Sequence, residues 1–195
     1  MSRGPDKQFD PEAALQKAME VFWAKGYTAT SIQDLVEATG LQRGSLYGAF
    51  GDKHGLYLAA LDAYLAGGTA NFESMLDGGA DPLDAVRNMV RTVADQATGP
   101  RAALGCMVAN TCSELAPHDE VARDRVQAFA ESVRSRFARA LRAAQEHGSF
   151  SRDRDAEAVA AHIHCTLQGL ALMGKSDTDP ATLRHVVDEI LAGLD

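Results

Sequence analysis

The chain has 195 residues, of which 46% are hydrophobic and 24% are charged, and its formal net charge is −8. This composition is typical of a soluble globular protein with one or two domains, and three cysteines cannot all pair within one chain, which excludes a disulfide framework. No run approaches the ~18 apolar residues of a membrane span, and Met1–Gln8 lacks an apolar signal region, so we expect a cytoplasmic protein with no membrane partner.

The first predicted helix runs from Pro11 to Gly26. Asp10 before Pro11 is a standard helix start, because proline suits the first helical turn and aspartate accepts hydrogen bonds from it. Apolar residues then recur at helical spacing: Leu15, Ala18, Met19 and Phe22. This segment is interpreted as the first helix of a three-helix unit.

The second predicted helix begins near Ser31. Thr30 stands where the N-cap is expected, and Gln33 three residues later completes a capping box. One apolar face follows, formed by Ile32, Leu35 and Val36. Gly40 supplies the left-handed residue that ends the helix.

The third predicted helix is short, with Leu46 and Phe50 facing inward. Its other positions carry donors and acceptors: Gln42, Arg43, Ser45 and Tyr47. Gly44 and Gly48 lie away from the core, where each costs about 1 kcal/mol relative to alanine. A missing Cβ there allows close approach to a phosphate or groove wall, the alternative being a frayed surface helix. Two short helices around one glycine turn form a helix-turn-helix, so the sequence predicts a DNA-binding protein.

The acidic charge is unevenly distributed along the chain. Residues 1–60 carry six basic and seven acidic side chains, so most of the net charge belongs to the remainder. An acidic body behind a near-neutral reading segment repels DNA everywhere except at that segment. We therefore expect site-selective binding to DNA and little non-specific binding.

Six further helices are predicted. Asp52 caps a long helix that runs to about Leu76, and residues 77–82 then break the chain. The later helices span residues 83–97, 102–115, 120–147, 155–173 and 181–192. The fold class is therefore all-α with nine helices, divided into an N-terminal helix-turn-helix DNA-binding domain (residues 1–55) and a larger C-terminal helical domain (residues 56–195).

The last two predicted helices carry apolar stripes. The final helix has one strong stripe, which includes Leu183, Val187, Ile190 and Leu191. The preceding helix has two, formed by Val159, Ile163, Thr166 and Leu170 and by Ala158, His162, Cys165 and Leu172. A helix that is apolar on two faces needs two partners, either two neighbours in a monomer or one neighbour and a second subunit. We assign the first of the two stripes, together with the stripe of the final helix, to a dimer interface.

A specific motif lies between Gly26 and Lys53. It consists of Tyr27 after glycine, Thr30-Ser31-Ile32 at the start of the second helix, and Gly40-Leu41-Gln42-Arg43-Gly44-Ser45-Leu46-Tyr47 followed by Phe50, Asp52 and Lys53. Through this motif the chain resembles tetracycline-repressor-like (TetR/AcrR) transcriptional regulators, and the resemblance of the motif covers residues 10 to about 60. The number of helices and the chain length are also similar to those of this family. The resemblance implies a homodimeric repressor whose larger domain dimerises and holds a ligand pocket. A small-molecule or thiol-reactive effector would release it from a palindromic operator.

Arg43, Ser45 and Tyr47 match motif positions that contact DNA in this family. Lys53 matches the basic residue that lies beside a phosphate. The full predicted DNA-binding set is Thr30, Ser31, Gln42, Arg43, Gly44, Ser45, Tyr47, Gly48 and Lys53. Gln42 stands where the family often has serine, and Gly48-Ala49 replace a bulkier pair. Base readout is therefore expected from Gln42, Arg43 and Ser45, and arginine at a guanine edge contributes about 1 to 3 kcal/mol of discrimination.

Residues 105–118 are the most unusual segment of the second domain. Cys106 and Asn110 are predicted to share one helix face, and Cys106 is either a thiol that senses electrophiles or a small buried apolar residue. The predicted effector pocket comprises Phe72, Met89, Cys106, Met107, Asn110, Phe129, His164 and Met173, with ordinary core packing as the alternative for each. His162 and His164 diverge on a helix, so no metal site is predicted.

Two other function classes compete with a DNA-binding regulator. A cysteine-dependent enzyme would use Cys106 or Cys112 with His118 as base, yet no nucleophile elbow, phosphate loop or cofactor fingerprint is present, so we expect neither an enzyme nor a cofactor. A helical module that binds a protein partner would be indicated if the purified dimer ignored all DNA. The sequence identifies neither the effector nor the operator.

Overall fold

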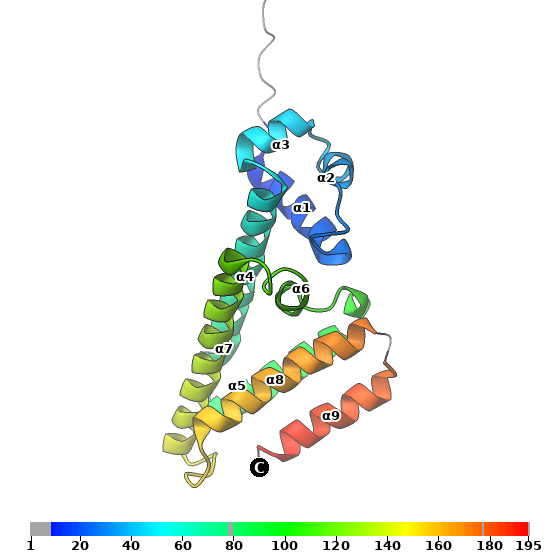
Figure 1. Ribbon diagram of the computed structural model, residues 1–195. Helices are drawn as coiled ribbons and strands as arrows, with labels where there is room; N and C mark the ends of the chain where they lie inside the picture. The colour runs from blue at the N-terminus through cyan, green and yellow to red at the C-terminus, as the bar shows by residue number, and fades with distance from the viewer. Residues whose placement is uncertain (1–8, 78–79, 177, 195) are drawn as a thin grey trace, which may run out of the picture. The chain divides into compact units, whose positions relative to one another are not determined.

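The structure, a computed structural model, describes residues 9–77, 80–176 and 178–194 (Figure 1). Within these ranges the chain forms nine α-helices and one short 3₁₀ helix, with no strand, which confirms the predicted all-α class. The helices are α1 (Pro11–Lys25), α2 (Ile32–Thr39), α3 (Arg43–Phe50), α4 (Lys53–Leu76), α5 (Pro82–Thr98), α6 (Met107–Glu114), α7 (Glu120–His147), α8 (Ala156–Lys175) and α9 (Pro180–Ala192). No helix in the described ranges is long and apolar enough to cross a membrane.

The chain divides into two compact units, Met1–Tyr64 and Leu65–Asp195, so that α4 begins in the first and ends in the second. Two predictions lie outside the described residues. They are the absence of a signal region in residues 1–8 and the glycine pair Gly78-Gly79 of the predicted break.

Aspartate residues start most of the helices, because their side chains accept hydrogen bonds from otherwise unpaired backbone N–H groups of the first turn. Asp10 Oδ1 accepts from Glu12 N at 2.9 Å, and Asp81 Oδ1 accepts from Leu83 N at 2.9 Å. The same cap is present at α7, α8 and α9, formed by Asp119, Asp155 and Asp179. In α1, α5 and α9 a proline occupies the first turn, as the Asp-Pro pairs in the sequence predict.

The first unit packs α1, α2, α3 and the beginning of α4 around one small core. Phe22, Leu35, Leu46 and Leu56 are fully buried, one from each of the four helices. The ring of Tyr57 meets that of Phe22 edge-on, with centroids 5.0 Å apart. Leu46 is the single buried residue of α3, so most of that helix faces solvent.

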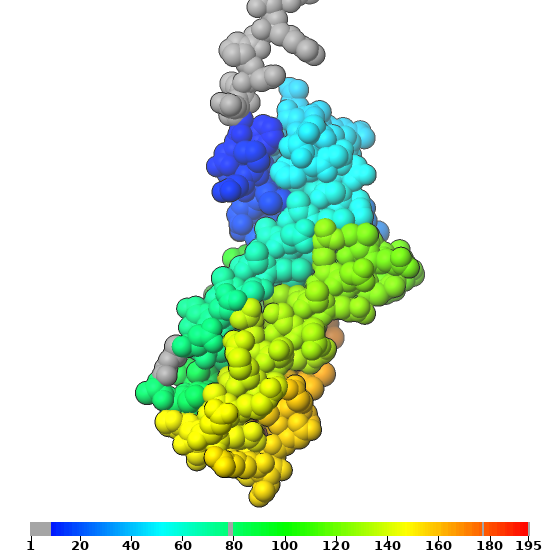
Figure 2. All heavy atoms as spheres, turned by 90° about the vertical axis from the view of Figure 1, so that its left-hand side faces the viewer, coloured from blue at the N-terminus to red at the C-terminus, as the bar shows by residue number. Residues whose placement is uncertain are grey.

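In the second unit, α5 packs against α7, α8 and α9. Its Met89 is fully buried among residues that include Phe137, Ile163 and Leu183. The end of α4 lies beside α7, as Figure 2 shows, with the ring of Phe72 edge-on to Phe137 at 5.8 Å between centroids. Two ion pairs also join this region to α7: Arg136 pairs with Glu73 of α4 at 2.6 Å, and Arg139 pairs with Asp77, the residue after α4, at 3.3 Å.

The single helix predicted over residues 102–115 is wrong. Residues Ala102–Leu104 form a 3₁₀ turn, and α6 begins only at Met107. Gly105 between them has φ of 64°, in the left-handed region where the helix cannot continue. Cys106 is therefore the N-cap of α6 and not a residue within a helix, so the predicted sharing of one helix face by Cys106 and Asn110 does not apply.

Candidate nucleic-acid interface

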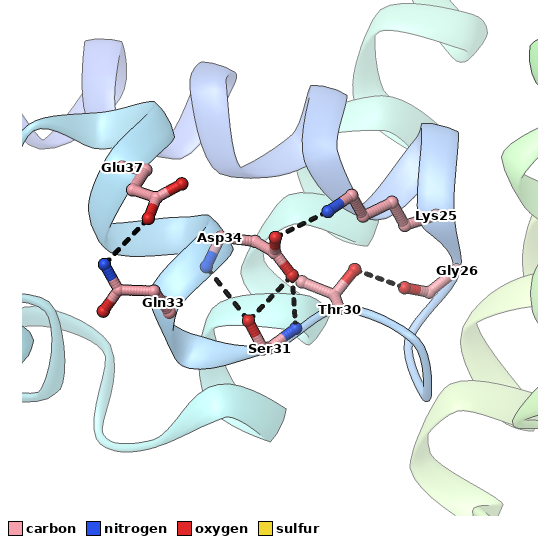
Figure 3. A network of polar contacts seen from close by, with 7 residues as sticks. All are labelled: Lys25, Gly26, Thr30, Ser31, Gln33, Asp34 and Glu37. Atoms are coloured by element: carbon pink, nitrogen blue, oxygen red, sulfur yellow. Dashed lines mark hydrogen bonds and ion pairs between the residues drawn. The ribbon is translucent and has the colours of Figure 1, made fainter.

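The turn into α2 is held by a network of side-chain hydrogen bonds (Figure 3). Ser31 is the N-cap: its Oγ accepts from Asp34 N at 3.1 Å, while Asp34 Oδ2 accepts from Ser31 N at 2.8 Å. The capping box is therefore Ser31 with Asp34, and the prediction of Thr30 with Gln33 is displaced by one residue. Thr30 instead donates its hydroxyl to the carbonyl of Gly26 at 2.6 Å.

This network also ties α2 to the end of α1. Lys25 Nζ lies 2.5 Å from Asp34 Oδ1 (Figure 3). The hydrogen bond from Lys25, followed by those from the backbone and hydroxyl of Ser31, lowers the pKa of Asp34 from its ordinary value of 3.8 to about 2. The carboxylate of Asp34 thus links the end of α1 to the first turn of α2.

The turn between α2 and α3 follows the prediction. Gly40 adopts the left-handed conformation, with φ of 74°, and its N–H donates to the carbonyl of Val36 at 2.9 Å. Thr39, which is buried, accepts from the backbone N–H of Leu41 at 3.2 Å. The end of α2 and the beginning of the turn are thus held by local hydrogen bonds.

The outward face of α3 is made of short side chains with one arginine. The exposed residues are Gln42, Arg43, Gly44, Ser45, Gly48 and Ala49. A Cβ added to Gly44 or Gly48 would meet nothing within 4 Å, so this face is open. The guanidinium of the exposed Arg43 lies 5.0 Å from the centroid of the half-buried Tyr47 ring one turn later, an arrangement that restricts the arginine.

The start of α4 lies next to the end of α3. Asp52 Oδ1 accepts from Gly55 N at 2.8 Å, which confirms the predicted cap. A Cβ on Gly55 would lie 2.2 Å from the carbonyl oxygen of Phe50, so only glycine fits there. Lys53, the first residue of α4, holds its ammonium 4.5 Å from the centroid of the Tyr27 ring.

The structure thus places eight of the nine predicted DNA-binding residues at or near the surface of the first unit. The exception is Thr30, whose side chain is 1% exposed and whose hydroxyl is already bonded within the turn, so Thr30 is withdrawn from the set. Sequence reasoning missed the role of Asp34 in the capping box. Asp34 could have been found, because it stands three residues after Ser31, the spacing of the box.

The predicted effector-pocket residues do not form one cluster. Phe72, Phe129 and Met89 belong to the core of the second unit, with the rings of Phe72 and Phe129 6.4 Å apart. Met173 is 39% exposed and lies outside that buried core. His164 is buried, and burial followed by the nearby Arg134 lowers its pKa, so its neutral form is favoured.

The α6 part of the predicted pocket is a polar junction with α8. Asn110 donates to the carbonyl of Leu104 at 3.1 Å and accepts from Lys175 Nζ at 3.0 Å. Met107 is buried and Cys106 is half-buried, whereas Cys112 is exposed. Loss of part of the hydration of its sulfur and then the neighbouring Cys106 raise the pKa of Cys112, which favours the unreactive thiol form.

Most of the residues predicted for the dimer interface pack within their own unit. Five of the eight are buried in its core: Ile163, Leu170, Leu183, Val187 and Ile190. The remaining three, Val159, Thr166 and Leu191, are half-buried. The other stripe of α8 faces outward instead, with Ala158, His162 and Cys165 exposed and Leu172 58% exposed. Tertiary packing against α5, α7 and α9 decides which stripe is internal.

Comparison with known proteins finds models of one protein family in both units. Residues 14–60 match the family described as bacterial regulatory proteins, tetR family, and residues 82–190 match the tetracyclin repressor-like C-terminal domain. The chain is 30% identical to the uncharacterised HTH-type transcriptional regulator YezE of Bacillus subtilis (strain 168), over 98% of this chain and 100% of YezE. It is 31% identical to the HTH-type transcriptional repressor ComR of Escherichia coli (strain K12), over 97% of this chain and 91% of ComR.

The fold is also that of a solved protein–DNA complex. A cysteine mutant of the TetR family transcriptional regulator CifR, complexed with double-strand operator DNA, superimposes with a TM-score of 0.86. The two sequences are 31% identical, and the match covers 98% of this chain and 100% of the CifR chain. This chain and the CifR chain are therefore similar in sequence and in fold over nearly their whole length.

Proposed function

Because the chain belongs to the TetR family of bacterial transcriptional regulators, we propose that it is a cytoplasmic homodimeric repressor that leaves a palindromic operator when an effector binds. The observation that carries this proposal is the outward face of α3, where Arg43 stands among small, exposed residues with open space around them. The printed descriptions of ComR as a repressor and of CifR in complex with operator DNA support the same activity for this chain.

The proposed DNA contacts divide by chemistry. Gln42, Arg43 and Ser45 offer donors and acceptors to base edges in the major groove. Tyr47 and Ser31 position the protein on the backbone, and Lys53 neutralises a phosphate. Gly44 and Gly48 allow the helix to lie deep in the groove.

Dimerisation is proposed through the exposed stripe of α8. Its residues Ala158, His162, Cys165, Gly169 and Leu172 alternate at spacings of four and three, the repeat of a helix seam that packs against another helix. Leu172, at 58%, is the most exposed of the large hydrophobic side chains in the described residues. A second copy of the same chain would cover it with a self-complementary surface.

The effector is proposed to be a small molecule or a thiol-reactive compound that acts in the second unit near α6. Support comes from Cys106, a half-buried thiol at the start of α6 beside the Asn110–Lys175 junction. The cysteine-dependent enzyme has less support, because the pKa of Cys112 is raised and not lowered.

The test is selection of bound sequences from random double-stranded DNA, with and without a thiol-reactive compound. The proposal expects one enriched palindrome whose recovery falls when the compound is added. A Cys106→Ser variant should keep the palindrome and lose the response. If no sequence is enriched at modest salt, the chain is not a sequence-specific regulator. If Cys106→Ser still responds, the effector acts elsewhere.

A further inference from the structure

The first residue of α4 carries a positive charge where the helix itself disfavours one. Lys53 begins a 24-residue helix, and the N-terminus of a helix carries a partial positive charge that favours anions and disfavours cations. The helix itself therefore does not favour the Lys53 ammonium. The ammonium lies over the face of the Tyr27 ring, 4.5 Å from Nζ to the ring centroid.

Tyr27 is itself held firmly in place. It lies in the turn between α1 and α2, and the edge of the Tyr57 ring meets it at 5.0 Å between centroids. The Phe22 ring stacks near it at 6.4 Å, and the His54 ring stands edge-on at 6.2 Å. These neighbours come from α1 and α4, and their contacts restrict the orientation of the ring.

We infer that Tyr27 is a positioning residue for DNA binding: its ring face holds the Lys53 ammonium at the start of α4, ready for a backbone phosphate. The inference rests on the proposed function and deepens it. A free lysine side chain loses much rotational freedom when it is fixed on a ligand. The Tyr27 ring removes part of that cost before DNA arrives, and a phosphate then supplies the negative charge that both the ammonium and the helix N-terminus favour.

The test separates the electrostatics of the ring from its shape. Phenylalanine analogues with increasing fluorination are placed at position 27, since fluorine withdraws the negative charge of the ring face while the ring still fills the same space. DNA affinity should fall stepwise, by about two- to five-fold over the series. Tyr27→Phe keeps the ring without fluorine and is therefore the reference of the series.

The same series in a Lys53→Gln background provides the decisive control. Lys53→Gln should weaken binding and reduce the slope of log affinity against log salt by about 1, as expected for a lost phosphate contact. Fluorination should then have no further effect. If the ring serves only in core packing, fluorination should reduce DNA affinity equally with Lys53 and with Lys53→Gln. That result would overturn the inference. So would tighter binding on fluorination, which would mean that the ring withholds Lys53 from DNA.

A measurement on the full chain without DNA keeps the two proposals distinguishable. The ε-methylene protons of Lys53 should resonate upfield in the NMR spectrum, because they lie over an aromatic ring, and Tyr27→Leu should remove the shift. If the wild type selects no DNA while the upfield shift is present, the proposed function fails and the Lys53–Tyr27 contact stands. If the shift is absent from the wild type, the positioning role fails whatever DNA the chain binds.

Discussion

Arg43 is the residue on which sequence-specific binding depends most. It is exposed on the first turn of α3, and its guanidinium lies beside Tyr47. Arginine is planar and donates two parallel hydrogen bonds, which match the O6 and N7 atoms of guanine. We expect Arg43→Ala to weaken binding to the selected operator by about 1 to 3 kcal/mol and to relax specificity at one position of each half-site.

The matched control for Arg43 is Arg184→Ala, which removes an exposed arginine from α9 in the second unit. Fluorescence anisotropy with labelled operator DNA measures both variants at one fixed salt concentration. Equal losses for the two would show that Arg43 contributes only general charge, contrary to the account.

Asp34 is expected to make the first unit sensitive to acid. Its folded pKa, about 2, lies below the ordinary 3.8, so the carboxylate stabilises the folded state above pH ~4 and this contribution disappears as the pH falls towards 2. Asp34→Asn should therefore lower the melting temperature at neutral pH, and its difference from the wild type should shrink between pH 4 and pH 2. Circular dichroism melts over that range check it, and a difference independent of pH would contradict the ion-pair account.

At the scale of helices, two glycines of the first unit are predicted to respond in opposite ways to the same substitution. A Cβ at Gly48 meets open space, so Gly48→Ala should stabilise α3 by about 1 kcal/mol through higher helix propensity. A Cβ at Gly55 would meet the Phe50 carbonyl at 2.2 Å, so Gly55→Ala should destabilise the unit by about 1 to 3 kcal/mol. Urea unfolding measures both.

Gly48→Ala also tests the depth of α3 in the groove. The stabilised variant should bind operator DNA more weakly, because the added methyl group meets the groove wall. Unchanged or tighter binding would show that Gly48 serves no close approach and that α3 is merely a weak surface helix.

Local signals predicted the helix starts well, since a cap and the first turn are only a few residues apart. They misplaced the cap of α2 because Thr30 and Ser31 are both hydroxyl residues with a suitable partner three positions later. The surrounding fold chooses Ser31 by burying Thr30. The break at Gly105 was missed because a glycine inside a helical pattern costs only about 1 kcal/mol, so periodicity alone does not locate an interruption.

At the scale of the whole molecule, the stripes of α8 show where sequence reasoning ends. Both stripes are apolar, and nothing in their spacing says which one faces α5, α7 and α9. The structure buries the stripe of Ile163 and Leu170 and exposes the stripe of Cys165 and Leu172. The predicted pocket residues are ambiguous for a similar reason, since methionine and phenylalanine at helical spacing fill cores as readily as they line cavities.

The exposed stripe predicts how the dimer can be broken without unfolding the subunit. Leu172→Glu places a charge on the proposed interface. We expect this variant to be monomeric and still to unfold in one cooperative transition, because Leu172 is not part of the subunit core. Val121→Glu, at a 45% exposed position of α7, is the control and should remain dimeric. Sedimentation velocity distinguishes the two, and a dimeric Leu172→Glu protein would exclude this face as the interface.

The most direct test of the central claim is a hydroxyl-radical footprint of the wild-type chain on DNA selected by that chain. The account predicts two protected half-sites related by a palindrome, with centres about 34 to 36 Å apart or a multiple of that, as two recognition helices in major grooves require. Arg43→Ala should remove the protection from both halves. Uniform weak protection without half-sites, or a footprint that Arg43→Ala leaves intact, would contradict the claim that α3 reads the operator.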